Sequence, residues 1–307
     1  MAGEVTERCP TGIVGFDNIS QGGFVRNSSN VIVGAPGSGK STFLLEFLYN
    51  GVMQYGENGL YCSFEPDILD TLNDAFVHGW DFFRLAEEGR IKFIKFSPET
   101  SIDELKNELT RLISQNDVKR ICFDPVSVLA LNINDEGKIR ERIFDLVSLM
   151  KRLRVTTVLA DESMESENGS GDTVTGEWTK TDIIRFLSDS VTSFYTTGLT
   201  PDGDRTLRIE KMRRTNHKRE FIGMKITNAG LEVFGKTAQQ QASDAMVQNL
   251  QNQINQQQQG SQMGQGGQGM GGAGSNQGMQ GQGGQPPATG GGGGMPPGGA
   301  GPGQGYS

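Results

Sequence analysis

The sequence predicts an α/β protein whose central sheet is mostly parallel, is flanked by helices and ends in an antiparallel C-terminal extension. Between Asn30 and Ala160, short apolar runs alternate with segments of helical periodicity, which is typical of βαβ units. From residue 190 to residue 234, β-like runs follow one another without a helical pattern between them. Consecutive strands without crossover helices favour antiparallel pairing.

The expected parallel strands are the apolar runs at 30–34, 59–64, 91–96, 120–124 and 155–160. The segment FLLEFLYNGV, which follows the first run, can form a helix. Apolar stripes at helical spacing indicate two more helices. Their residues are Leu105, Leu109, Leu112 and Ile113 in one stripe, and Ile139, Ile143, Leu146, Val147, Met150 and Leu153 in the other. The antiparallel strands are expected at 190–197, 206–212, 221–227 and 231–234.

Composition divides the 307 residues into a folded domain at 1–237 and a tail at 238–307. The tail is rich in Gln, Gly, Met and Pro, and its single charged side chain is that of Asp244. Such a segment buries too little apolar surface to offset the entropy of ordering it. We therefore expect a disordered tail, long enough to reach a protein partner that the sequence does not identify.

Two other segments leave alternatives open. Residues 163–181 have no periodicity and are interpreted as a long loop, which is uncommon in a compact domain unless it is functional. In the tail, Val247, Leu250 and Ile254 have roughly helical spacing, so this part is either a short pairing helix or disordered like the rest.

The formal charge of -8 argues against a broadly basic surface that coats nucleic acid. Three widely spaced cysteines, Cys9, Cys62 and Cys122, suggest neither a disulfide framework nor a zinc site, and they fit a reducing cytoplasm. No stretch of eighteen apolar residues occurs, so no insertion into a membrane is expected.

The segment GAPGSGKS at 34–41 fits the phosphate-binding pattern GxxxxGK[ST], follows an expected strand and begins an expected helix. Glycines let backbone N–H groups face the phosphates, Lys40 reaches the β and γ oxygens, and the Ser41 hydroxyl binds Mg²⁺. The chain is therefore expected to bind ATP with Mg²⁺. The predicted binding residues are Gly34, Ala35, Pro36, Gly37, Ser38, Gly39, Lys40, Ser41 and Thr42.

Two carboxylates are candidates for the remaining chemistry. Asp124 closes a buried strand and is predicted to support the metal together with Ser41; the alternative is an ordinary helix cap. Hydrolysis requires a group that orients the attacking water, and we expect it at the end of the strand beside the P-loop strand. Glu65, which follows GLYCSF, is interpreted as that group, the alternative being a first-turn helical glutamate.

The segment KMRRTNHKR at 211–219 is densely basic. Lys211 and Arg213 are two residues apart at the end of an expected strand, so their side chains are predicted to point the same way. In a ring of subunits such a pair reaches the γ-phosphate that the neighbouring subunit holds, as an arginine finger does. The alternative is a solvent-exposed charged surface without a specific role.

Taken together, these residues resemble the KaiC-like branch of the RecA-type ATPases. The resemblance covers about residues 8–234 and rests on TGIVGFDNISQGG at 11–23, the P-loop, FE at 64–65, the Asp124 strand, LADES and KMRRTNH. It implies a RecA-like fold in homo-oligomeric rings, usually hexamers, with ATP between subunits. It also implies phosphate and metal roles for Lys40 and Ser41, water activation by Glu65, metal support by Asp124 and a trans contact by Lys211 and Arg213.

The chain departs from the clock members of this group at two places. Those proteins have two glutamates after the second strand, whereas this chain has Glu65 followed by Pro66. The adjacent Ser and Thr phosphosites of the double-domain clock protein correspond to Arg185 and Phe186, in a register set on SDS at 188–190. Autophosphorylation and clock function are therefore not carried over.

The function that the sequence favours is an ATPase of slow turnover that acts as a regulatory or scaffolding switch. One alternative is a RecA/RadA-type DNA-binding recombination or repair ATPase. It is not favoured because the expected loop at 163–181 carries four acidic residues, and Lys180 is its only basic residue. A negatively charged loop repels the phosphates of DNA. A second alternative is a structural protein that binds nucleotide without turnover.

Overall fold

The computed structural model describes residues 6–64, 68–130, 133, 135–162, 180–200, 203–217, 219–234 and 246. The strands are β1 (Arg8–Cys9), β2 (Phe24–Val25), β3 (Ser29–Gly34), β4 (Asn58–Ser63), β5 (Ile91–Lys95), β6 (Val118–Asp124), β7 (Thr156–Glu162), β8 (Ser190–Tyr195), β9 (Arg205–Met212), β10 (Ile222–Thr227) and β11 (Gly230–Val233). The helices are α1 (Phe16–Ile19), α2 (Lys40–Tyr55), α3 (Ile68–Val77), α4 (Phe82–Glu87), α5 (Ile102–Gln115), α6 (Glu136–Arg152) and α7 (Lys180–Leu187), with a 3₁₀ turn η1 (Val126–Ala130).

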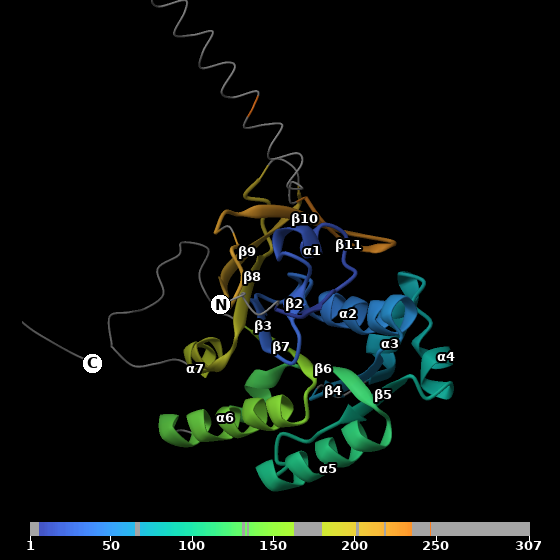
Figure 1. Cartoon of the computed structure of the whole chain (residues 1–307), viewed down its shortest axis with the longest axis vertical. Coiled ribbons are helices and arrows are strands. Elements are labelled where there is room, and N and C mark those ends of the chain that lie inside the picture. The colour runs from blue at the N-terminus through green and yellow to red at the C-terminus, as the bar shows by residue number, and fades with distance from the viewer. Residues whose placement is uncertain are drawn as a thin grey trace, which may run out of the picture. The chain divides into compact units, whose positions relative to one another are not determined.

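Within the described residues, one sheet has the strand order β11-β10-β9-β8-β3-β7-β6-β4-β5, and β1 pairs with β2 separately (Figure 1). Strands β8, β3, β7, β6, β4 and β5 pair parallel with one another in that order. Strands β9, β10 and β11 pair antiparallel. The predicted α/β fold with an antiparallel C-terminal extension is confirmed.

The core has two layers because successive side chains of a strand face opposite sides of the sheet. Ile32 of β3 belongs to the cluster that packs against α1 to α4, while Val31 and Val33 belong to the cluster that packs against α5, α6 and α7. The two predicted apolar stripes lie on the core-facing sides of α5 and α6; Leu112 and Leu153 are only partly buried, and Leu153 lies just beyond the end of α6.

Local sequence signals explain where several helices begin and end. At the start of α5, Ser101 and Glu104 form a capping box, in which each side chain accepts from the other residue's backbone N–H. At the end of α2, Gly56 takes a left-handed conformation with φ of 66°, which glycine adopts at little cost. Helices α3 and α4, by contrast, were not expected from the sequence, since both are short.

The expected strands lie within two residues of the observed ones. Helix α7 begins at Lys180, so the last two residues of the expected loop at 163–181 belong to that helix. Residues 163–179 and the predicted tail at 238–307, apart from Met246, lie outside the described residues. None of the helices in the described part of the chain is long and apolar enough to cross a membrane.

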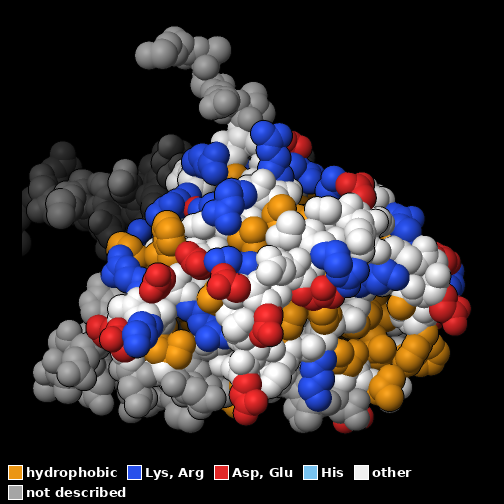
Figure 2. Space-filling model, turned by 90° about the horizontal axis from the view of Figure 1, so that it is seen from below, with side chains coloured by type: hydrophobic (Ala, Val, Ile, Leu, Met, Phe, Trp, Pro, Cys, Tyr) orange, Lys and Arg blue, Asp and Glu red, His pale blue; other side chains and the backbone are white. Residues whose placement is uncertain are grey.

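One face of the molecule carries Lys and Arg side chains intermixed with Asp and Glu, and hydrophobic side chains gather toward the side where α3 and α4 lie (Figure 2). The exposed hydrophobic residues of these two helices are Leu69, Phe76, Val77 and Phe83. A gathering of this kind is more typical of an interface than scattered single residues are.

Candidate functional site

The P-loop at 34–42 joins β3 to α2, at the carboxyl edge of the parallel strands, as the motif predicts. Gly37 and Gly39 have φ of 77° and 100°, a conformation that residues with a Cβ rarely adopt. At Gly34, a Cβ would lie 2.6 Å from the carbonyl oxygen of Phe194 on β8. The glycines of the motif are therefore required by the backbone path.

Lys40 is the first residue of the 16-residue helix α2 and is only 7% exposed. Its Nζ donates to the carbonyl oxygens of Gly34 at 2.9 Å and Ala35 at 3.1 Å, which holds the ammonium inside the loop. The hydroxyl of Ser38 is buried and has no hydrogen-bond partner among the described residues. A buried cation, a free hydroxyl and the positive end of a helix form a cradle that fits phosphate.

Asp124 ends β6 at the same edge of the sheet and is 5% exposed. Tyr61 of β4 donates a hydrogen bond from its hydroxyl to Asp124 Oδ2 at 2.7 Å. A buried carboxylate whose orientation is fixed by a second side chain is suited to support a magnesium ion. No cluster of three or more His, Cys, Asp or Glu side chains able to hold a metal occurs in the described part of the chain. The residues thus fit Mg²⁺ that takes further ligands from phosphate and water.

Glu65 lies outside the described residues, but the strand before it does not lie where we expected. Strand β4 is separated from β3 by β7 and β6, so the prediction that Glu65 follows the strand beside the P-loop strand is wrong. Apolar runs do not specify the spatial order of parallel strands, because a crossover connection leaves room for later strands to insert. The carboxyl end of β4 nevertheless lies at the P-loop edge, since β4, β6 and β7 are parallel.

The P-loop strand lies between β8 and β7, and β7 ends in two carboxylates that were not selected from the sequence. Asp161 pairs with Val33 and Glu162 with Gly34, so both lie next to the start of the P-loop. Asp161 is fully buried, whereas Glu162 is exposed. The signal was available in VTTVLADE, a buried run that closes on acidic residues at the same edge as the phosphate loop.

Arg205 was also missed as a P-loop residue. It begins β9, and its Nε donates to the carbonyl oxygen of Gly37 at 3.2 Å. Because β9 runs antiparallel to β8, the first residue of β9 lies at the P-loop edge. Only the pairing of these two strands brings Arg205 there, and a sequence does not show that pairing directly.

Lys211 and Arg213 lie at the opposite edge of the sheet from the P-loop of their own chain. Lys211 pairs with Val191 near the start of β8, whereas Phe194 of the same strand pairs with Gly34. Lys211 Nζ donates to the carbonyl oxygens of Phe186 at 3.2 Å and of Ser188. Burial, followed by the charge of Arg213, lowers the pKa of Lys211. Within one chain, the structure does not bring this pair to the phosphates.

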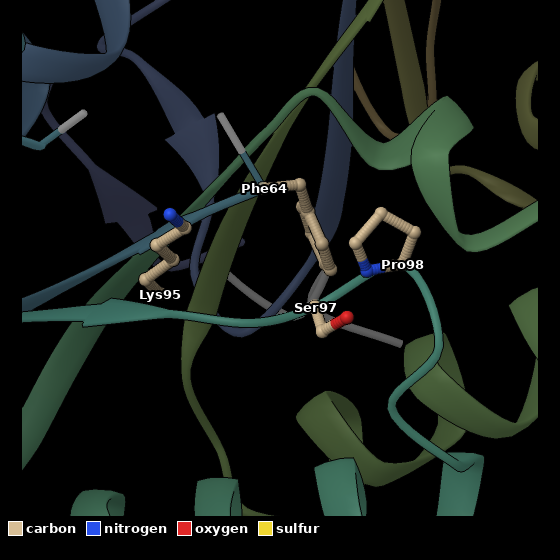
Figure 3. Close-up of a pocket in the computed structure, with 4 residues that line it drawn as sticks. All are labelled: Phe64, Lys95, Ser97 and Pro98. Atoms are coloured by element: carbon tan, nitrogen blue, oxygen red, sulfur yellow. The ribbon is translucent and has the colours of Figure 1, made fainter. Parts of the chain in front are cut away.

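An open cavity of about 500 Å³ lies where β4 and β5 end, and Phe64, Lys95, Ser97 and Pro98 line it (Figure 3). In this view the rings of Phe64 and Pro98 lie near each other, and Lys95 lies on the other side of Phe64. Phe64 immediately precedes Glu65, the predicted water-activating residue, in the sequence.

Known proteins resemble this chain in sequence and in fold. The family model described as "ATPase: KaiC" matches residues 9–238. Over 239 residues the chain is 28% identical to the circadian clock oscillator protein KaiC of Parathermosynechococcus lividus, covering 75% of this chain and 43% of that protein. With KaiC of Nostoc sp. it shares 29% over 242 residues, or 76% of this chain and 45% of the relative. The chain thus spans less than half the length of these curated relatives.

Among solved structures, the KaiC-like protein of the hyperthermophilic archaeon Pyrococcus horikoshii OT3 is similar over nearly its whole length. The TM-score is 0.64, the sequence identity is 28%, and the match covers 75% of this chain and 99% of the other. The RecA-like architecture predicted from the motifs is therefore shared with a protein of comparable domain size.

Proposed function

Because the chain belongs to the KaiC family of ATPases, we propose that it binds Mg-ATP at its P-loop and hydrolyses ATP slowly within a ring of like subunits. The observation that carries the proposal is the position of Lys40, which is buried in the loop at the start of α2. A lysine held there exchanges its two carbonyl partners for the β and γ oxygens of the nucleotide.

The remaining loop residues have separate tasks in this proposal. The backbone N–H groups around Gly37 and Gly39 donate to the phosphates, and Ser41 and Asp124 hold the magnesium ion. When bound, Mg²⁺ neutralises negative charge on the triphosphate. Tyr61 keeps Asp124 in one orientation through their hydrogen bond. Arg205 adds a cation at the tip of the loop.

We assign orientation of the attacking water to Glu65, which follows β4 in the sequence; the carboxyl end of β4 lies at the edge shared by β4, β6 and β7. Glu162 on β7 is the matched comparison, since it is adjacent to Gly34. Glu65→Gln is expected to bind ATP normally and to lose phosphate release, while Glu162→Gln retains it. The reverse result would assign the role to Glu162.

Lys211 and Arg213 act on the nucleotide of a neighbouring subunit in this proposal. Their place at the edge opposite their own P-loop supports a trans contact, because a closed ring joins unlike edges of successive subunits. The exposed hydrophobic residues of α3 and α4 are consistent with a chain that associates. By analogy with the oligomeric relatives, we propose a hexamer.

Mixed rings test the trans contact. Lys40→Ala is expected to abolish phosphate release and Arg213→Ala to slow it by roughly 10³- to 10⁵-fold, whereas the control Lys119→Ala, which removes an exposed ion pair with Asp117, is expected to do neither. Mixing the two inactive variants one to one creates intact sites at on the order of a quarter of the interfaces and restores activity in proportion. If rings that are proven to be mixed, by co-purification of an untagged variant with a tagged one, show no recovery, a trans Arg213 is excluded.

The cellular role that we propose is a regulatory or scaffolding switch in the cytoplasm, with a protein partner bound through the tail. Slow turnover suits such a role, because the ATP and ADP states then persist long enough to bind different partners. Pull-down of partners with the full chain and with residues 1–237, each in ATP and in ADP, tests it. Partners that bind equally in ATP and in ADP, and equally to the full chain and to residues 1–237, would count against the switch.

A further inference from the structure

Asp189 holds two cations at once. Its side chain is 9% exposed and lies just before β8, where Oδ2 accepts from Lys151 Nζ at 2.8 Å and Oδ1 from Arg213 Nη1 at 3.2 Å. Oδ2 also accepts from the backbone N–H of Ser29, at 3.0 Å. The carboxylate therefore joins the end of α6, the start of β3 and the turn after β9.

The two cations are not equivalent. The side chain of Arg213 is 56% exposed and that of Lys151 is 40% exposed. The backbone N–H of Arg213 donates to the carbonyl oxygen of Asp189 at 3.0 Å, which fixes the base of the side chain while leaving its guanidinium at the surface. Arg213 is thus the partner that can leave without moving the backbone.

We propose that Asp189 and Lys151 are positioning residues for Arg213: Asp189 holds the guanidinium in the free subunit, and Lys151 keeps Asp189 neutralised when Arg213 turns to the neighbour's triphosphate. This inference rests on the trans contact proposed above. It explains why one carboxylate has two cationic partners.

The physical reason is the cost of a buried charge without a counter-ion. Removing the sole partner of a buried carboxylate is strongly unfavourable, whereas removing one of two is much less so. A guanidinium binds phosphate through parallel hydrogen bonds, so the triphosphate competes well with Asp189 for Arg213. Lys211 is near enough for its pKa to be influenced by the charge of Asp189, but it is not the direct partner, because its ammonium donates to the carbonyl oxygens at the end of α7.

A double-mutant cycle on the full chain tests the inference. With saturating Mg-ATP, Lys151→Met is expected to lower turnover about tenfold, which corresponds to roughly 1.4 kcal/mol, without changing nucleotide affinity. In the Arg213→Ala background, where slow rates are measured with radiolabelled ATP, Lys151→Met is expected to change nothing. Lys119→Met, which breaks a lysine–aspartate pair at the same edge of the sheet, is the matched control.

A second variant, Asp189→Asn, removes the carboxylate charge itself instead of its partner Lys151. Asp189→Asn keeps an oxygen that accepts from Ser29 but no longer attracts Arg213, so Lys151→Met is expected to have no effect on turnover when combined with it. If Lys151→Met lowers turnover by the same factor with and without Arg213, in variants that fold and assemble, the inference is overturned while the trans contact stands. Full activity of Arg213→Ala overturns both.

Discussion

The hydroxyl of Tyr61 donates to Asp124 Oδ2 at 2.7 Å, linking two neighbouring strands at the edge where the metal is proposed to bind. Partners that orient a metal-binding side chain typically contribute 10- to 100-fold to metal affinity. Tyr61→Phe is therefore expected to raise the Mg²⁺ concentration for half-maximal phosphate release by at least about tenfold. Magnesium titrations at fixed ATP measure this.

The matched control for that prediction is Tyr49→Phe. It also removes one tyrosine hydroxyl, but Tyr49 lies on α2, where its ring stacks on Trp80 at a centroid distance of 6.0 Å. Its magnesium dependence is expected to match that of the wild type. If Tyr61→Phe and Tyr49→Phe show the same dependence of phosphate release on Mg²⁺, then either Asp124 does not bind the metal or Tyr61 does not orient Asp124.

The sequence was sufficient for features that depend on local pattern. The P-loop, both amphipathic helices and the buried strands follow from spacing alone, because each is written in consecutive residues. Features that depend on the order of strands were not predictable in this way. The insertion of β6 and β7 between β3 and β4 brought Asp161 and Glu162 to the P-loop, and the antiparallel return of β9 brought Arg205 there.

Arg205 is predicted to contribute to nucleotide binding. Its guanidinium contacts the carbonyl oxygen of Gly37 at 3.2 Å, so it lies beside the phosphates that the loop is proposed to hold. Arg205→Ala is expected to weaken ATP binding about tenfold, since one charge-assisted contact is lost. Titration with a fluorescent ATP analogue measures the affinity. Arg208→Ala, on the same strand but packed over Phe221, is expected to bind normally.

Gly51 is predicted to be required for packing rather than for flexibility. A Cβ at this position of α2 would lie 2.5 Å from Cδ of Arg120, which is fully buried. Arg120 has no room to move, because it is bound to Glu57 at 2.6 Å and to the carbonyl oxygen of Phe47 at 2.9 Å. Alanine would otherwise favour the helix by about 1 kcal/mol.

The expected net effect of Gly51→Ala is a loss of about 1 kcal/mol in the free energy of unfolding, since overpacking a core commonly costs 1–3 kcal/mol and the helix propensity of alanine offsets about 1 kcal/mol of that cost. Urea denaturation of the apo protein measures it. A gain in stability would mean that the Arg120 side chain shifts without cost, and the buried Arg120–Glu57 pair would then be less rigid than its distances indicate.

Glu46 is predicted to make the stability of the domain depend on pH. Burial raises its pKa to about 7, against the opposing effect of hydrogen bonds from Leu231 N–H and from Asn50. A raised pKa means that the folded state holds the proton more tightly, so stability is fully present below pH of about 4.5 and falls as pH rises to about 7. Glu46→Gln, whose amide oxygen still accepts from Leu231, is thus expected to stabilise the domain at pH 8 by on the order of 3 kcal/mol and to have little effect near pH 4.5. Thermal unfolding at both pH values measures this.

Glu104→Gln is a control of opposite sign: Ser101 lowers the pKa of Glu104, so removing this carboxylate is expected to destabilise the domain at pH 8. Equal stabilities of Glu46→Gln and wild type at pH 8 would show that Glu46 is ionised without cost in the folded protein.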